Sequence, residues 1–204
     1  MLKFVLTCLL ASAFVAPQLP AHSAPPTAKD IVVRVQKNDA AFEVEVEFTV
    51  AASAEESWDV LTDYDHMAQI VSSIDSSRIV SRDGNRIEVA QKSHASVGLL
   101  RVSTDSLRQV NLIPNREIHS RLVKGDLKAS EFTTRVIDEG ATTRVTAQGK
   151  FIPSALAASA ITVEAVEAQT RRQYQELRAE ILRRKAKEPP PPCLLAKNCQ
   201  QSTG

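Results

Sequence analysis

The side chains that could do chemistry in this chain are few and widely spaced. Beyond the N-terminal segment the histidines are His66, His94 and His119. His66 follows an acidic stretch, while His94 and His119 fall on the polar faces of two alternating segments, where we expect them to be solvated. A zinc site needs three or four converging ligands, and no ligand stands at metal-binding spacing from these histidines. The sequence therefore predicts neither a metal site nor another cofactor.

No nucleophile motif or phosphate-binding loop accompanies the histidines. The sequence has no activated serine or cysteine pattern and no glycine-rich loop of the phosphate-binding type. Most acidic residues fall at expected helix caps, turns and outward strand positions, and Glu131 and Arg135 share a strand face on which we expect them to pair. A buried carboxylate acting as acid or base stays an open alternative. We assign no catalytic residue from the sequence.

The N-terminal segment, residues 1–24, is typical of a secretory signal peptide. Lys3 precedes the apolar run Phe4–Val15, which is too short to span a bilayer, and small residues stand near a cleavage point at 23–24. An uncleaved N-terminal anchor is the alternative. We expect the mature protein to be periplasmic or secreted.

Charge and cysteine content suggest which partner to exclude and where a disulfide could form. The formal net charge is +1, and removal of Lys3 with the signal peptide leaves equal numbers of basic and acidic side chains. Proteins that bind nucleic acid usually show a basic excess, so no nucleic-acid partner is expected. The tail at 188–204 carries Cys193 and Cys199 after a proline run. In an oxidising compartment these two cysteines are expected to form a disulfide loop.

The region between these ends predicts one domain of the α+β class. Residues 42–50 alternate strictly between apolar and polar side chains, which indicates a half-buried strand. Ser53 and Glu56 form a capping-box pattern for a helix that ends at Asp63–Asp65, and a second short helix is expected near 66–71. Further strands are expected at 78–82, 86–94, 100–111, 117–123, 128–138 and 142–151, and a long helix at 156–187. Residues 25–41 form either a linker or an edge strand.

The order of these elements and three local motifs resemble a known superfamily. The motifs are FTVAASAEESWDVLTDYD at 48–65, SRIV at 77–80 and GDLK at 125–128. They are similar to the START-like superfamily (SRPBCC, helix-grip), which includes plant pollen allergens, polyketide cyclases and dehydrases, and coenzyme-Q-binding START-type proteins. The resemblance covers about 42–185, within a domain at 42–187. It implies a curved antiparallel sheet of about seven strands wrapped around the long C-terminal helix. Trp58 would then hold the first short helix against the sheet.

Folds of this kind leave a cavity between sheet and helix, and the alternation of each strand suggests which side chains face it. The strand candidates are Val89, Gln91, Ser93, Val102, Thr104, Ile118, Ser120, Phe132, Thr134, Val145 and Ala147. Tyr64 and Met67 are candidates at the cavity mouth, with the Tyr64 hydroxyl expected near solvent. Apolar walls with a few hydroxyl groups suit an amphipathic ligand. A one-residue slip would exchange the faces of a strand, and a sheet packed solidly on its helix is the alternative.

These observations favour a protein that binds or transfers a hydrophobic small molecule without catalysis. The resemblance suggests a lipid, a quinone or an isoprenoid-like compound as the ligand. One alternative is an enzyme similar to the polyketide cyclases and dehydratases, in which Gln91, Thr104 or Ser120 orients the substrate. Another is an interaction protein with a filled core. The basic end of the long helix, at 171–187, is either a solvated face or a surface for transient membrane contact.

Overall fold

The computed structural model of the chain describes residues 31–97, 100–154, 158 and 161–187. The predicted signal peptide and the tail that holds Cys193 and Cys199 lie outside these residues. Most of the small-residue stretch at 155–160 lies outside them as well.

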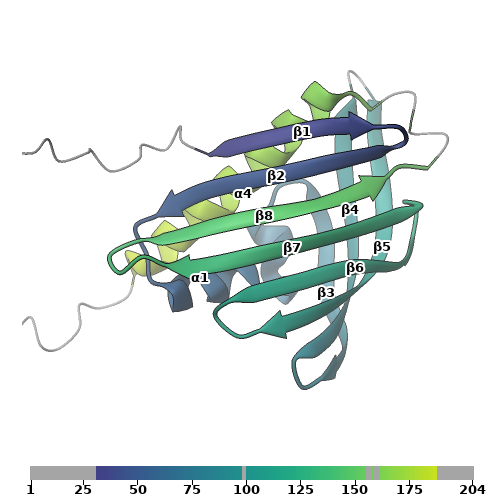
Figure 1. The fold of residues 1–204 in the computed structure, drawn as a ribbon. Coiled ribbons are helices and arrows are strands. Elements are labelled where there is room, and N and C mark those ends of the chain that lie inside the picture. Colours follow the sequence, from purple (N-terminus) through teal and green to yellow (C-terminus); the bar gives the residue numbers. More distant parts are fainter. Residues whose placement is uncertain (1–30, 98–99, 155–157, 159–160, 188–204) are drawn as a thin grey trace, which may run out of the picture.

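A single curved antiparallel sheet forms the body of the domain (Figure 1). It has eight strands in the order β1-β2-β8-β7-β6-β5-β4-β3. Their bounds are β1 Val32–Asn38, β2 Ala41–Val50, β3 Ile74–Asp83, β4 Arg86–Val97, β5 Leu100–Ile113, β6 Glu117–Gly125, β7 Ala129–Asp138 and β8 Thr143–Ile152. Consecutive strands from β3 to β8 are neighbours, and β2 closes onto β8. This is the expected helix-grip sheet with one strand more than predicted.

The additional strand is β1, which forms an edge of the sheet. It pairs with β2 from Val32 opposite Glu47 to Asn38 opposite Ala41. The hairpin turn places Asp39 at φ 52°, in the left-handed region where aspartate is better tolerated than most residues. The strict alternation of β2 appears in its burial, because Phe42, Val44, Val46, Phe48 and Val50 are buried and the glutamates between them are exposed.

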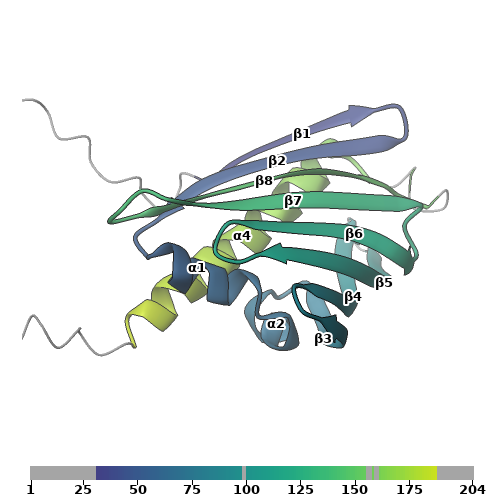
Figure 2. The same ribbon diagram turned by 60° about the horizontal axis from the view of Figure 1, so that its bottom comes forward.

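Three short helical segments close one end of the sheet, and Figure 2 shows α1 and α2 beside the lower part of the long helix α4. They are α1 (Ala54–Leu61), the 3₁₀ turn η1 (Tyr64–His66) and α2 (Met67–Ile70). The predicted capping box is present, since the Ser53 hydroxyl accepts from the Glu56 N–H at 3.1 Å and the Glu56 carboxylate accepts from the Ser53 N–H. Trp58 is buried in the main core, as expected.

The long helix α4 (Val163–Lys185) crosses the concave face of the sheet (Figures 1 and 2). It begins later than the predicted start at residue 156, because Ile161 and Thr162 are not helical and the Thr162 hydroxyl caps the helix by accepting from the Ala165 N–H at 3.2 Å. The apolar face of α4 packs on the core through Val166, Tyr174, Leu177 and Ile181. Among the helices of the described residues, none is long and apolar enough to cross a membrane.

Candidate functional site

A cavity of about 460 Å³ lies between the concave face of the sheet and the first half of α4. Its walls come from β2, β4, β5, β6, β7, β8 and α4. The apolar part of the lining is Val44, Val46, Leu127, Phe132, Phe151, Ile161, Ala165 and Val166. The polar part is mostly uncharged and includes serine, threonine and glutamine side chains from the strands and from α4. The volume is within the range of known small-molecule pockets, which is about 300–1,000 Å³.

Five of the side chains proposed from the sequence line this cavity together: Gln91, Ser93, Thr104, Ser120 and Phe132. Val89, Ile118, Val145 and Ala147 are buried in the sheet–helix core instead, and Met67 is buried as well. Val102 and Thr134 are half-buried outside the lining. The strands therefore present the expected faces, but the cavity occupies only part of the concave surface. Ligand binding by any of these residues stays a prediction.

Tyr64 does not have its hydroxyl near solvent, as the sequence suggested. Its ring packs against the core, and burial raises the pKa of its phenol while the nearby positive charge of Arg108 opposes the shift. Burial also raises the pKa of Tyr174, a lining residue, to about 12, against a hydrogen bond with Thr134 that lowers it. Both phenols are therefore neutral hydroxyl groups near neutral pH.

Arg108 is the main lining residue that sequence reasoning missed. It stands on β5 two residues after Ser106 and two before the buried Val110, so alternation alone places it on the concave face. Its Nε donates to the Ser120 hydroxyl at 2.7 Å and its Nη1 to the Ser130 hydroxyl at 3.1 Å. Burial lowers the pKa of this guanidinium, and Tyr64 acts in the opposite direction. The charge of Arg108 argues against an inward position in a sequence-based reading, because charged side chains are rarely buried.

His94 is also placed differently from the expectation. Its side chain is only 17% exposed, and its Nδ1 lies 3.0 Å from an Asp75 carboxylate oxygen, so it is not solvated. Arg101 donates to the same oxygen at 2.7 Å. Residue His94 contributes to the cavity lining. A carboxylate–histidine pair next to a cavity is a common arrangement for moving a proton.

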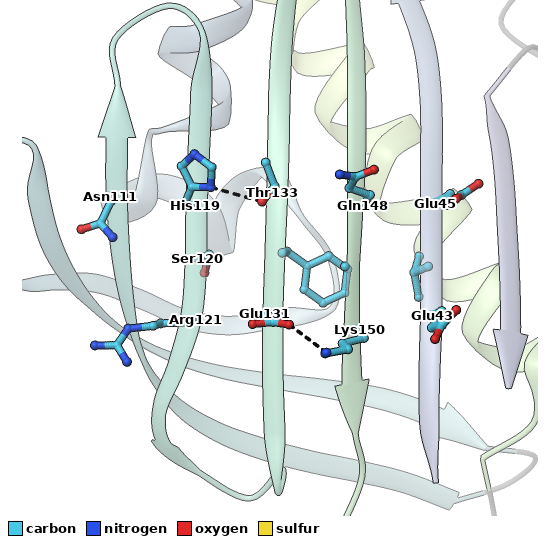
Figure 3. Close-up of a pocket in the computed structure, with 13 residues that line it drawn as sticks. Glu43, Glu45, Asn111, His119, Ser120, Arg121, Glu131, Thr133, Gln148 and Lys150 are labelled. Atoms are coloured by element: carbon cyan, nitrogen blue, oxygen red, sulfur yellow. Dashed lines mark hydrogen bonds and ion pairs between the residues drawn. The ribbon is translucent and has the colours of Figure 1, made fainter. Parts of the chain in front are cut away.

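The convex face of the sheet carries a second hollow, of about 500 Å³, shown in Figure 3. Polar side chains that pair with one another surround it: Lys150 forms an ion pair with Glu131 at 3.1 Å, and His119 Nδ1 lies at hydrogen-bond distance, 3.2 Å, from the Thr133 hydroxyl. Glu131 thus pairs across to β8, and Arg135 pairs with Glu117 rather than with Glu131 as predicted. We regard this hollow as part of the solvated outer face of the sheet, because no apolar wall comparable to that of the cavity encloses it.

Polar contacts tie the part of α4 from Arg171 to Lys185 to the rest of the domain. Near the end of the helix, Arg184 donates to the Asp63 carboxylate at 2.6 Å and Lys185 donates to the Ala51 carbonyl at 2.8 Å. Earlier in the helix, the Glu176 carboxylate accepts a hydrogen bond from the Ser72 hydroxyl at 2.6 Å. Arg171 donates to the Ile31 carbonyl, and Gln173 to the Ser73 hydroxyl at 3.0 Å. Much of the basic charge at the end of this helix is therefore engaged within the protein.

Asp63 and Glu180 show how strongly these contacts act on charge. Burial by itself would raise the pKa of Asp63, but the hydrogen bonds and charges of Arg184 and His66 outweigh it and lower the pKa. The hydrogen bond from Arg183, supported by Arg184, lowers the pKa of Glu180 to about 2.

Within the described residues, no three histidine, cysteine, aspartate or glutamate side chains lie close enough together to hold a metal ion.

Known proteins resemble this chain chiefly in fold. An aromatase/cyclase from Streptomyces is 22% identical and matches with a TM-score of 0.59, over 71% of this chain and 96% of its own. A STAR-related lipid transfer protein from Xanthomonas axonopodis matches at 17% identity and a TM-score of 0.61, over 78% and 98% of the two chains. Human STARD10 matches at 10% identity and a TM-score of 0.58, over 76% and 74%.

Sequence comparison identifies the family. No match was found among the curated proteins. The family model described as polyketide cyclase/dehydrase and lipid transport matches residues 41–186, which span strands β2 to β8, the short helices and α4. This match shows that the chain belongs to the polyketide cyclase/dehydrase and lipid transport family, and the helix-grip architecture of the solved structures agrees with it.

Proposed function

We propose that this protein binds a hydrophobic small molecule in the cavity between the sheet and α4 and carries it without changing it chemically. The observation that supports this most directly is the cavity of about 460 Å³, with an apolar wall and a set of neutral polar groups. Removing apolar ligand surface from water would drive binding, and the polar groups would fix the orientation. The structural likeness to a STAR-related lipid transfer protein supports the same class of function.

The cellular setting is part of the proposal. The signal-peptide pattern at residues 1–24 supports a carrier that acts in the periplasm or outside the cell. A lipid, a quinone or an isoprenoid-like compound is the ligand class to test first.

The experiment is mass spectrometry of an organic extract from the mature protein, purified gently from the exported fraction. The test variant is Ala165→Phe, which places a ring in the cavity from α4, and its matched control is Ala168→Phe on the exposed side of the same helix. We expect a stoichiometric lipid-like compound from the wild type and from the control, and much less from Ala165→Phe. Equal extracts from all three proteins would contradict binding in this cavity.

A neutral fluorescent probe gives a second readout that does not depend on ligand surviving purification. Nile red should bind to the delipidated wild type and to Ala168→Phe, and bind weakly to Ala165→Phe. Absence of saturable Nile red binding to the wild type would favour a filled-core interaction protein.

A second function, catalysis in the same cavity, has one specific observation in its favour. His94 is oriented by Asp75 at 3.0 Å and contributes to the lining near Gln91 and Thr104. The structural likeness to an aromatase/cyclase fits such chemistry. The extracted compound would be incubated with wild type and His94→Gln. A time-dependent mass change seen only with the wild type, at equal affinity, would replace the carrier proposal with an enzyme.

A further inference from the structure

The cavity contains one permanent charge, and its sign restricts the ligand. Among the described residues, Arg108 is the only arginine or lysine in the lining, and no aspartate or glutamate belongs to that set. Within the described part of the chain, Arg108 has no carboxylate at ion-pair distance, although thirteen such pairs occur elsewhere. Arg108 is half-buried, and a charge that is partly withdrawn from water without a counter-charge is costly, so native proteins normally pair it.

The hydrogen bonds of Arg108 hold the guanidinium without neutralising it. Nε donates to the Ser120 hydroxyl, Nη1 to the Ser130 hydroxyl and Nη2 to the Ser120 carbonyl at 3.5 Å. All of these acceptors are uncharged. A guanidinium has five N–H groups, so each terminal nitrogen keeps one that no described residue accepts. Those two groups suit the two oxygens of a planar anion.

The surroundings offer no alternative counter-ion. Tyr64 lies near Arg108, but burial raises the pKa of its phenol, so it carries no negative charge near neutral pH. Gln169 of α4 adds a further donor to the lining, since its buried Nε2 has no hydrogen-bond partner among the described residues. The polar side of the cavity is thus rich in donors and has one positive charge.

We propose that the ligand is an amphipathic carboxylic acid whose carboxylate binds to Arg108 and whose apolar tail lies against Val44, Val46, Phe132 and Phe151. This inference rests on the proposed function and names the substrate class of the same site. A single carboxylate matches the single guanidinium, whereas a phosphate dianion would bring a second negative charge into a cavity with no second cation.

The test compares ligands that differ only in the head group. Hexadecanoic acid, its methyl ester and hexadecyl phosphate would compete with Nile red for the delipidated mature protein at neutral pH. We expect the acid to bind about 10- to 100-fold more tightly than the ester, which is the range for hydrogen bonds to a charged group. Arg108→Met should lose this preference, so that it binds the acid no more tightly than the ester. Arg121→Met, on the convex face, should keep it.

Each outcome bears on the proposal. Equal affinity of the wild type for acid and ester overturns it, and so does an acid preference that survives in Arg108→Met. Tighter binding of the phosphate than of the acid assigns the site to phosphate instead. Because the wild-type comparison of acid with ester needs no variant, poor folding of Arg108→Met leaves the test intact. If Nile red itself does not bind, the carrier function fails first, and that result is distinguishable from a ligand that binds without regard to its head group.

Discussion

Gly149, in the middle of β8, faces a side chain that leaves no room for a methyl group. It stands opposite Phe132 in the pairing of β7 with β8, and no register shift interrupts that pairing. A Cβ atom at Gly149 would lie 2.6 Å from Cδ1 and Cγ of the Phe132 ring and would also meet the Glu131 carbonyl oxygen. Carbon atoms normally approach to about 3.5–4.0 Å. Gly149 therefore allows close packing of β8 against the Phe132 ring.

We expect Gly149→Ala to destabilise the domain for this reason. The ring and the β7 backbone must both move by about 1 Å, and overpacking of this kind costs about 1–3 kcal/mol. The usual gain of about 0.5–1 kcal/mol on replacing a strand glycine by alanine offsets part of that cost. The net loss of about 1–2 kcal/mol should lower the urea midpoint by about 0.5–1 M.

Urea unfolding followed by Trp58 fluorescence measures this effect. Because Phe132 lines the cavity, the displaced ring should also weaken Nile red binding. The double variant Gly149→Ala with Phe132→Leu removes the ring contact and should regain part of the affinity and stability, while the contact with the Glu131 carbonyl stays. An unchanged or higher urea midpoint for Gly149→Ala would refute the reasoning, since it would mean that the strands separate at no cost.

Three further substitutions test the elements that position the site. Ser53→Ala removes the capping box of α1 and should lower the unfolding free energy by about 1 kcal/mol. The control Ser81→Ala, at an exposed position of β3, should change the unfolding free energy by less than about 0.5 kcal/mol. Equal urea midpoints for the two variants would count against a stabilising cap. Trp58→Ala should cost about 3–5 kcal/mol, measured by denaturation monitored with circular dichroism, and a loss below about 1 kcal/mol would show that Trp58 is not a core residue. Glu180 has a pKa lowered to about 2 from 4.5, chiefly by the hydrogen bond from Arg183. Its contribution to stability is therefore complete above pH 4.5 and is lost as the pH falls toward 2; after solvent screening it is on the order of 1 kcal/mol. In Glu180→Gln the unfolding free energy should depend less on pH in this window, and an identical pH profile would be incompatible with the ion pairs seen here.

Local patterns in the sequence were sufficient to predict most of the sheet. The alternation at 42–50, the turn residues between strands and the capping box of α1 all depend on neighbours a few residues away, and the structure confirms them. The sequence does not decide between a linker and an edge strand at 25–41, because the alternation of apolar and polar residues there is weak. Only the pairing with β2 shows that Val32–Asn38 is a strand. The start of α4 was wrong because a lone Thr162 cap is a small signal within an alanine-rich stretch.

The site could be predicted only in part. Alternation identified the concave face, and five candidates line the cavity, but periodicity alone does not show where the helix fills the space above the sheet. Arg108 lay in the correct phase and was missed because its charge argued against burial. The partners of Asp75 and Glu131 depend on the exact register between paired strands, which single-sequence patterns do not determine.

The uneven attachment of α4 has a consequence for its motion. Among the described residues, its polar contacts to other elements begin at Arg171 and continue to Lys185, whereas residues 163–170 contribute mainly to the cavity wall. Opening fluctuations should therefore be rarer in the second half, and amide hydrogen exchange should be slower there than in the first two turns. A ligand in the cavity would give residues 163–170 of α4 additional contacts, which the rest of the protein does not provide. Exchange protection on binding should accordingly increase most at 163–170, so that this end of the helix reports whether the cavity is filled.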